Sequence, residues 1–157
     1  MKTIIDNPTK LSKELITQLL ELIENGSQVD SNGLYDRIMR AELIAIRFDN
    51  NVIVTTATLK NPFDSYRKKV FTGAGIAIDT AAYNKELGYI VTNPKYEGKK
   101  HCQALLEAFM PVIAHTRIFA TTRKSAMIHI LSKYGFTIAG TSYNEDLQLL
   151  LYTPLED

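Results

Sequence analysis

The chain has 157 residues, of which 45% are hydrophobic and 22% charged, and its formal net charge is +1. This length suits one domain over residues 1–157, and the balanced charge gives no reason to expect nucleic acid or an acidic membrane as a partner. The single cysteine excludes an internal disulfide, and no apolar run has the length of a signal peptide or a membrane span. We therefore expect a cytoplasmic protein.

Two helices and a hairpin are predicted for the first 60 residues. Leu11–Asn25 has apolar residues on one helical face, and Gly26 follows as a stop signal. A shorter helix is predicted over Gly33–Ala41, after residues that often cap helices. Glu42–Phe48 and Val52–Leu59 are rich in β-branched residues and flank a short polar turn, which is typical of a β-hairpin.

The segment from Asn61 to Asn84 has no clear period. Val70-Phe71 and Ile76-Ala77-Ile78 are predicted as short strand pieces, and the basic run Arg67-Lys68-Lys69 as a solvated loop. Gly73-Ala74-Gly75 is expected to be a bend, since no third glycine or helix follows it as a dinucleotide-binding turn would require.

The second half alternates strands and helices. Pro111 is expected to kink or end the first of its helices. The predicted order is a strand, a basic turn, a helix, a strand, a helix and two strands: Gly88–Thr92, Lys95–Lys100, the helix carrying Leu105 to Met110, Ile118–Thr122, Lys124–Tyr134, Phe136–Gly140 and Leu147–Tyr152. This order predicts an α/β domain with a mixed sheet.

The basic turn before the first of these helices carries the chemical prediction. The N–H groups of a first helical turn lack partners within the helix and attract anions such as phosphate. Lys99 and Lys100 add positive charge there. Cys102 lies where a thiol pKa would be lowered, but we expect a small core or loop residue there rather than a nucleophile. His101, His115 and His129 lack metal-ligand spacing, so no metal site is expected.

Two stretches resemble the GNAT superfamily of N-acetyltransferases. They are ELGYIVTNPKYEGKKHCQALLEAF, from Glu86 to Phe109, and IFATTRKSAMIHILSKYGF, from Ile118 to Phe136. The first is similar to the family's fourth strand, its pyrophosphate loop and the following helix, and the second to the strand, helix and Gly-Phe corner that complete the coenzyme A site. The resemblance implies a GNAT-like α/β fold with a mixed, mostly antiparallel central sheet flanked by helices.

The resemblance also implies acetyl transfer from acetyl-coenzyme A to a primary amine of a small molecule or peptide. It points to an acidic residue or ordered water near the fourth strand as the base. Glu86 is the candidate, with a surface carboxylate at a strand end as the alternative interpretation, and Tyr143 is a possible acid. A backbone N–H near Val91 to Asn93 would polarise the acetyl carbonyl. Because homodimers are common for this fold, a homodimer is one expectation for this protein. The implied cofactor-binding residues are Val91, Thr92, Asn93, Gly98, Lys99, Lys100, His101, Cys102, Gln103 and Lys124.

Several positions depart from the family pattern. Glu97, Lys100 and Cys102 replace arginine, glycine and glycine, and we expect helical backbone angles at the last two. Leu131 replaces the tyrosine that often protonates the leaving thiolate; Tyr134 is a further substitute but lies on the core stripe. These departures leave two alternatives open: a catalytically silent domain of this fold that binds coenzyme A or a protein, and an unrelated α/β nucleotide-binding module.

Overall fold

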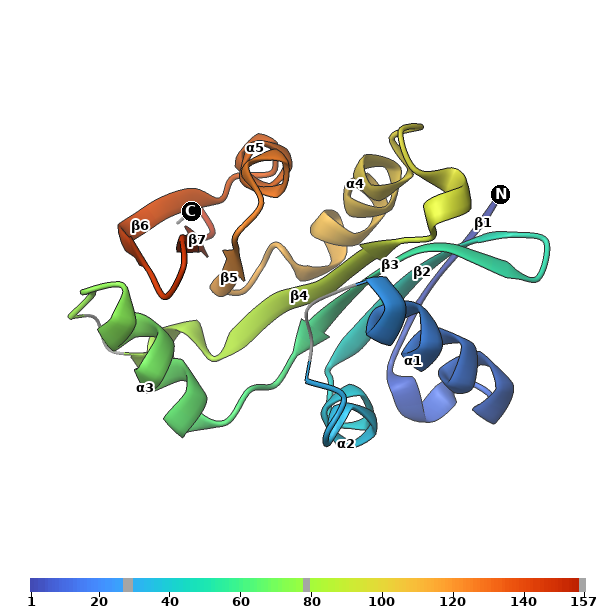
Figure 1. Cartoon of the computed structure of the whole chain (residues 1–157), viewed down its shortest axis with the longest axis horizontal. Helices are drawn as coiled ribbons and strands as arrows, with labels where there is room; N and C mark the ends of the chain where they lie inside the picture. Colours follow the sequence, from blue (N-terminus) through green and yellow to red (C-terminus); the bar gives the residue numbers. More distant parts are fainter. Residues whose placement is uncertain (27–29, 78–79, 156–157) are drawn as a thin grey trace. The chain divides into compact units, whose positions relative to one another are not determined.

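The computed structural model describes residues 1–26, 30–77 and 80–155; the predicted strand residue Ile78 lies outside them. Helices and short 3-10 turns (η) alternate with strands along the chain (Figure 1). The helices and turns are η1 (Pro8–Lys10), α1 (Lys13–Gly26), α2 (Leu34–Met39), α3 (Asp64–Gly73), η2 (Thr80–Tyr83), η3 (Pro94–Tyr96), α4 (His101–Ile113) and α5 (Ser125–Lys133). The strands are β1 (Lys2–Asp6), β2 (Leu43–Asp49), β3 (Val52–Lys60), β4 (Lys85–Thr92), β5 (Ile118–Thr122), β6 (Thr137–Tyr143) and β7 (Leu147–Tyr152).

The strands form one sheet with the order β1-β2-β3-β4-β5-β7-β6. β4 and β5 run parallel. The pairs β1–β2, β2–β3, β5–β7 and β6–β7 are antiparallel. The prediction of a mixed, mostly antiparallel sheet with helices is confirmed.

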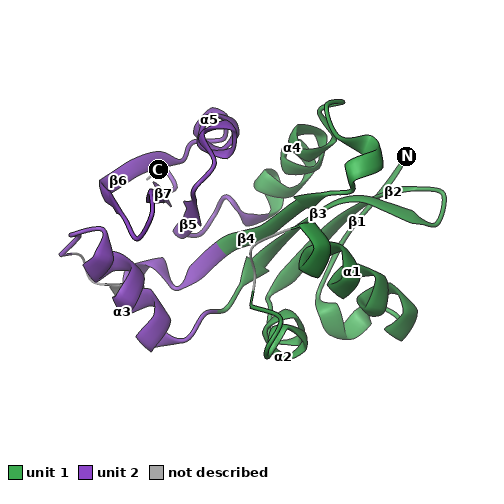
Figure 2. Ribbon diagram, in the orientation of Figure 1, with its two compact units in different colours: residues 1–61, 87–112 green, residues 62–86, 113–157 purple. Residues whose placement is uncertain are grey.

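The chain divides into two compact units, coloured separately in Figure 2. Unit 1 comprises residues 1–61 and 87–112, and unit 2 comprises residues 62–86 and 113–157. β4 contributes its first two residues to unit 2 and the rest to unit 1. One domain over residues 1–157 stays a prediction, and each unit is described by itself below.

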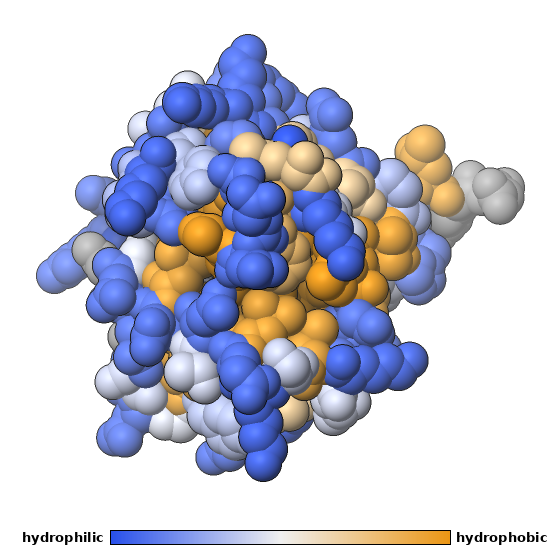
Figure 3. All heavy atoms as spheres, turned by 90° about the vertical axis from the view of Figure 1, so that its right-hand side faces the viewer, coloured by the Kyte–Doolittle hydropathy of each residue, from blue (hydrophilic) through white to orange (hydrophobic). Residues whose placement is uncertain are grey.

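The core of unit 1 is built by α1, α2 and the predicted hairpin. Ile16, Leu19 and Ile23 are the buried stripe of α1, at the spacing that places them on one helical face. They belong to one cluster with Ile44 and Ile46 of β2. The side of the molecule on which unit 1 is drawn carries mostly hydrophilic side chains, with apolar atoms visible between them (Figure 3).

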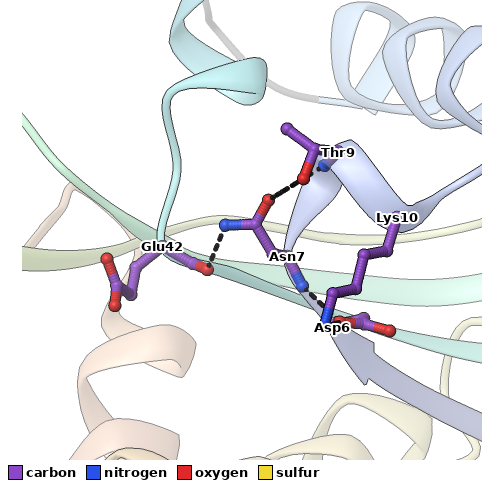
Figure 4. A network of polar contacts seen from close by, with 5 residues as sticks. All are labelled: Asp6, Asn7, Thr9, Lys10 and Glu42. Atoms are coloured by element: carbon purple, nitrogen blue, oxygen red, sulfur yellow. Dashed lines mark hydrogen bonds and ion pairs between the residues drawn. The ribbon is translucent and has the colours of Figure 1, made fainter.

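Strand β1 was missed by the sequence analysis, because only two isoleucines mark it and it is an edge strand of the sheet. Its end is held by a polar network around Asn7 (Figure 4). The Asn7 side chain donates to the Glu42 carbonyl at 3.1 Å and accepts from the Thr9 backbone at 3.0 Å. Asp6 accepts from the Asn7 backbone at 2.8 Å, and its Oδ1 lies 3.9 Å from Lys10 Nζ. Asn7 therefore caps η1 and ties it to the chain at the start of β2.

In unit 2 the structure corrects the prediction for residues 64–73. Val70 and Phe71 lie in α3, not in a strand, and the basic run is helical rather than a loop. The first turn explains this: Asp64 pairs with Arg67 at 2.8 Å and with Lys68 at 3.1 Å, at the spacings of a helical turn. Val70 and Phe71 then pack in one cluster with Phe119 and Leu149.

One helix prediction needs a smaller correction. Pro111 does not end α4, which continues to Ile113. A proline this close to the end removes one hydrogen bond and leaves little helix beyond it to disrupt. α5 is confirmed, with Ala126 on its exposed side and Leu131 buried.

Candidate functional site

In unit 1, the predicted anion site is the loop that joins β4 to α4. Asn93 organises its start. Its side chain accepts from the Lys95 backbone at 3.1 Å and donates to the Ile53 carbonyl at 3.2 Å, and its own N–H donates to the Val54 carbonyl at 2.7 Å. The Asn93 N–H is therefore engaged by β3 and does not serve the role of polarising a substrate carbonyl.

The loop has a left-handed backbone at two positions. Gly98 has a φ of 79°, and a side chain there would meet no atom within 4 Å. Lys100 has a φ of 61°, which corrects the expectation of helical angles at this residue. The backbone at Lys100 thus adopts the conformation that glycine favours, at the position where the resemblance places glycine, at a cost of about 1–2 kcal/mol for a side-chain-bearing residue.

The start of α4 presents His101, Cys102 and Gln103, which are all half-buried. His101 Nδ1 accepts from Arg47 Nε at 3.3 Å, and its ring lies edge-on to Tyr96. Burial raises the pKa of the Cys102 thiol to about 11, so the expected lowering is wrong. Desolvation of a thiolate on this face of the helix outweighs the helix dipole and the neighbouring lysines.

The exposed side of the loop is positively charged. Lys95, Lys99 and Lys100 are exposed, as is Gly98. Tyr96 donates to Asp49 Oδ2 at 3.0 Å, which ties η3 to the end of β2. The loop therefore offers a fixed backbone and three lysines to an anion at the start of a helix.

An irregular residue lies within β4. Tyr89 has a φ of 48°, rare for a tyrosine and strained within a strand. Its hydroxyl accepts from Arg37 Nε at 2.9 Å, and Lys60 Nζ lies 4.2 Å from its ring centre. Gly88 was the available signal, since a glycine inside a strand often marks such an irregularity.

In unit 2, a buried carboxylate is the centre of a second candidate site, which we call the Glu86 cluster (Tyr66, Glu86, Thr121 and Tyr143). Glu86 is 2% exposed, and its Oε2 accepts from the Tyr66 hydroxyl at 3.1 Å. Tyr66 as a whole is 39% exposed. The pKa of its hydroxyl is nevertheless raised, mainly by burial and secondly by the nearby Glu86 carboxylate. A hydrogen bond with Thr121 acts in the opposite direction on this pKa.

Tyr143 joins the same cluster from the end of β6. Its ring lies against Gly73 of α3, where an added Cβ would be only 2.4 Å from the ring. The pKa of Tyr143 is raised, mainly by burial and secondly by the Glu86 carboxylate, and Arg123 offsets part of this rise. Both predicted catalytic residues are thus within electrostatic range of each other, and Tyr143 carries its proton at neutral pH.

The other predicted residues have plainer surroundings. Val91 is buried, and the Thr92 hydroxyl lies 3.1 Å from that of Thr55. Lys124 is an exposed residue of unit 2 at the N-cap of α5. Leu131 is 1% exposed in α5. Its side chain has no hydroxyl and cannot donate a proton to a leaving thiolate. Tyr134 is half-buried at the end of the same helix.

No family model matches the sequence, and no curated protein sequence is similar enough to be a relative. Solved structures do match. An acyl-CoA N-acyltransferase from Pseudomonas aeruginosa is 12% identical, with a TM-score of 0.69 over 97% of this chain and 99% of the other. A GNAT-family acetyltransferase from Streptococcus agalactiae is 17% identical, with a TM-score of 0.69 over 98% and 96%. The chain has the GNAT fold.

A third structure with this fold carries a ligand. The PaiA N-acetyltransferase from Thermoplasma acidophilum, in complex with coenzyme A, is 16% identical, with a TM-score of 0.61 over 98% of this chain and 99% of that one. At these identities the likeness establishes the GNAT fold alone. Within residues 1–26, 30–77 and 80–155, no three metal-ligating side chains gather as a metal site, and no helix has the length and apolar character of a membrane span.

Proposed function

We propose that the protein transfers an acetyl group from acetyl-coenzyme A to a primary amine of a small molecule or peptide. The observation that carries this proposal is the Glu86 cluster, which combines a buried carboxylate with a protonated tyrosine. Burying a carboxylate costs several kcal/mol unless hydrogen bonds compensate it, so such a group is more often found where chemistry requires it. The GNAT fold and the basic loop before α4 support the same proposal.

The loop of unit 1 fits the pyrophosphate of coenzyme A. The space around Gly98 is open, and Lys99 and Lys100 are exposed on the same loop. Because Gly98 has no side chain, a phosphate can come close to its backbone. A turn that wraps around a phosphate also requires left-handed backbone, as at Lys100. Gly98, Lys99, Lys100 and the first turn of α4 would hold the cosubstrate, which supplies an activated acetyl group as a thioester.

The residues of unit 2 supply proton transfers. An amine attacks only when neutral, and in this proposal Glu86 removes its proton as a general base. Tyr143 remains protonated at neutral pH and is the candidate donor for the departing thiolate, since Leu131 provides no hydroxyl. The free thiol pKa is about 8.5, so the thiolate leaves tolerably well and the acid assists rather than controls the reaction.

Thermal melting with and without acetyl-coenzyme A tests the first half of the proposal. A ligand at 100 times its Kd adds about 2.7 kcal/mol of stability. Thiol release with a panel of amines, including a polyamine, an amino acid and a peptide N-terminus, tests the second half. Absence of a melting shift at millimolar acetyl-coenzyme A contradicts the proposal.

A second candidate function is a silent domain that binds coenzyme A without turnover. The buried Leu131, at the position where the resemblance places a tyrosine, is the observation that favours it. A melting shift without thiol release on any amine of the panel distinguishes this candidate from the enzyme.

A further inference from the structure

Tyr66 is a residue of the Glu86 cluster that the sequence analysis did not identify. It lies in the first half of α3, and its hydroxyl donates to Glu86 Oε2 at 3.1 Å. The Thr121 hydroxyl of β5 hydrogen-bonds to the same phenol, and the Tyr66 ring lies 6.5 Å from the Phe119 ring, centre to centre. Phe119 is the residue paired with Glu86 in the sheet. Tyr66 is thus held from two sides while it holds the carboxylate.

The helix that carries Tyr66, α3, is held firmly in place within unit 2. The Thr141 backbone of β6 donates to the Ala74 carbonyl at the C-terminal end of α3, at 3.0 Å. The approach is so close that a Cβ on Gly140 would lie 2.1 Å from the Ala74 oxygen. Val70 and Phe71 are buried on the same helix. A tyrosine on a helix docked in this way places its hydroxyl reproducibly, since only two side-chain torsions remain and its ring is in contact with that of Phe119.

We infer that Tyr66 is a positioning residue, which holds the Glu86 carboxylate in one orientation for removing the proton of the acceptor amine. This inference rests on the proposed function. A carboxylate has a soft terminal torsion, and one charge-assisted hydrogen bond from a rigid donor is sufficient to select one of its orientations. Correct orientation of a catalytic base in the bound complex is a large part of its effect on rate.

The chemistry of Tyr66 suits a donor and not a second acid or base. Burial and the adjacent carboxylate raise the pKa of its phenol, so it keeps its proton over the whole range in which an amine is acetylated. Tyr143 and Arg123 of unit 2 also act electrostatically on this cluster. Tyr66 therefore donates to Glu86 at every pH of interest and acts through that residue.

The substitution Tyr66→Phe tests the inference, because it keeps the ring and removes only the hydroxyl. We expect kcat to fall about 10- to 100-fold, the loss that follows from removing a hydrogen bond to a charged group, with the KM for acetyl-coenzyme A unchanged. The matched control is Tyr83→Phe in the same unit. Tyr83 also bonds a side-chain hydroxyl, that of Thr153 at 2.8 Å, and packs 6.1 Å from Phe71. The control is expected to lower Tm by a similar amount and to leave kcat unchanged.

A double-variant cycle separates positioning from a structural role. In the background of Glu86→Gln, adding Tyr66→Phe is expected to cause no further loss of kcat, and the Tm decreases of the two substitutions should not add. Additive losses of kcat, or a kcat of Tyr66→Phe equal to that of Tyr83→Phe, would overturn the inference while leaving the proposed function intact. A wild-type protein that releases no thiol with any amine overturns the proposed function, and the role of Tyr66 with it.

Should Tyr66→Phe not fold, Thr121→Val serves in its place. It removes the hydroxyl that holds Tyr66 from β5 and leaves Tyr66 itself intact. A decrease of about threefold in kcat, without a change in the KM for acetyl-coenzyme A, supports the inference. An unchanged kcat in a folded Thr121→Val overturns it.

Discussion

The loop between β4 and α4 is exposed and continuous in sequence, whereas the Glu86 cluster surrounds a buried carboxylate and is assembled from four separate elements. The loop of unit 1 uses backbone conformation and lysines, and its charges lie in water. The cluster of unit 2 places one carboxylate among hydroxyls contributed by α3, β5 and β6. Charges in water are screened and individually weak, whereas a buried carboxylate depends strongly on each neighbour. Substitutions in the cluster should therefore have larger effects than substitutions in the loop.

The largest effect is expected at Glu86. Glu86→Gln keeps the shape of the side chain and removes the base, so kcat should fall by about 100-fold or more. Stabilisation by acetyl-coenzyme A should persist, since the loop that would bind it belongs to unit 1. Steady-state kinetics measure the fall in kcat, and thermal melting measures the stabilisation by acetyl-coenzyme A. Glu107→Gln, at an exposed position of α4, is the control for both. Full activity of Glu86→Gln would show that the cluster does not contain the base.

The reactivity of the Cys102 thiol tests whether this side chain is buried at the start of α4. With its pKa raised by burial from 9.0 to about 11, the thiol should react with iodoacetamide at pH 8 about 100-fold more slowly than in the urea-unfolded protein. Its contribution to stability is complete below pH 9 and is lost as the pH rises towards 11, because the unfolded thiol ionises first. Equal reaction rates in the folded and unfolded protein contradict this burial.

Charge reversal in the loop should have a moderate effect. Lys99→Glu is expected to raise the Kd of acetyl-coenzyme A about tenfold, and less at high salt, because the exposed charge is screened. Gly98→Pro should weaken binding as well, since proline cannot adopt the φ of 79°. Titration calorimetry measures both, and Lys13→Glu, an exposed lysine of α1 in the same unit, is the control. Unchanged affinity in both loop variants would mean that the loop does not bind the cosubstrate.

The smallest expected effect concerns the left-handed backbone at Lys100. Lys100→Gly and Lys100→Ala both remove the charge, but only glycine adopts a φ of 61° without strain. The free energy of unfolding should be about 1 kcal/mol greater for the glycine variant than for the alanine variant. Urea denaturation measures this difference. Equal stabilities would show that the backbone at Lys100 relaxes at no cost.

Much of the fold could be predicted because its signals are local. The hairpin of β2 and β3, the strand-turn-helix from β4 to α4 and the final helix and strands follow from hydrophobic period, turn residues and caps. β1 was missed because an edge strand with two apolar residues gives little signal. α3 was misread because Val70 and Phe71 favour strands by themselves, whereas the ion pairs of Asp64 stabilise a helix.

The candidate site divides in the same way. The basic loop was predicted because its glycine, lysines and helix start are adjacent in the sequence. Glu86 and Tyr143 were named from the resemblance, but Tyr66 and Thr121 were not, because each is an ordinary residue until the fold places it beside Glu86. The strained backbone at Tyr89 was missed as well, although Gly88 inside the strand was a signal for it.

The sequence by itself determined most of the order of helices and strands, although not β1 or α3, together with the charge of the loop and the absence of an internal disulfide, since these depend on neighbouring residues and on counts. Only the tertiary structure decided that Glu86 is buried against Tyr66, that Lys100 takes a left-handed conformation and that the Cys102 thiol is less acidic than usual. The physical reason is that burial, hydrogen bonding and strain arise between residues far apart in the chain. Their energies appear only when packing brings those residues together.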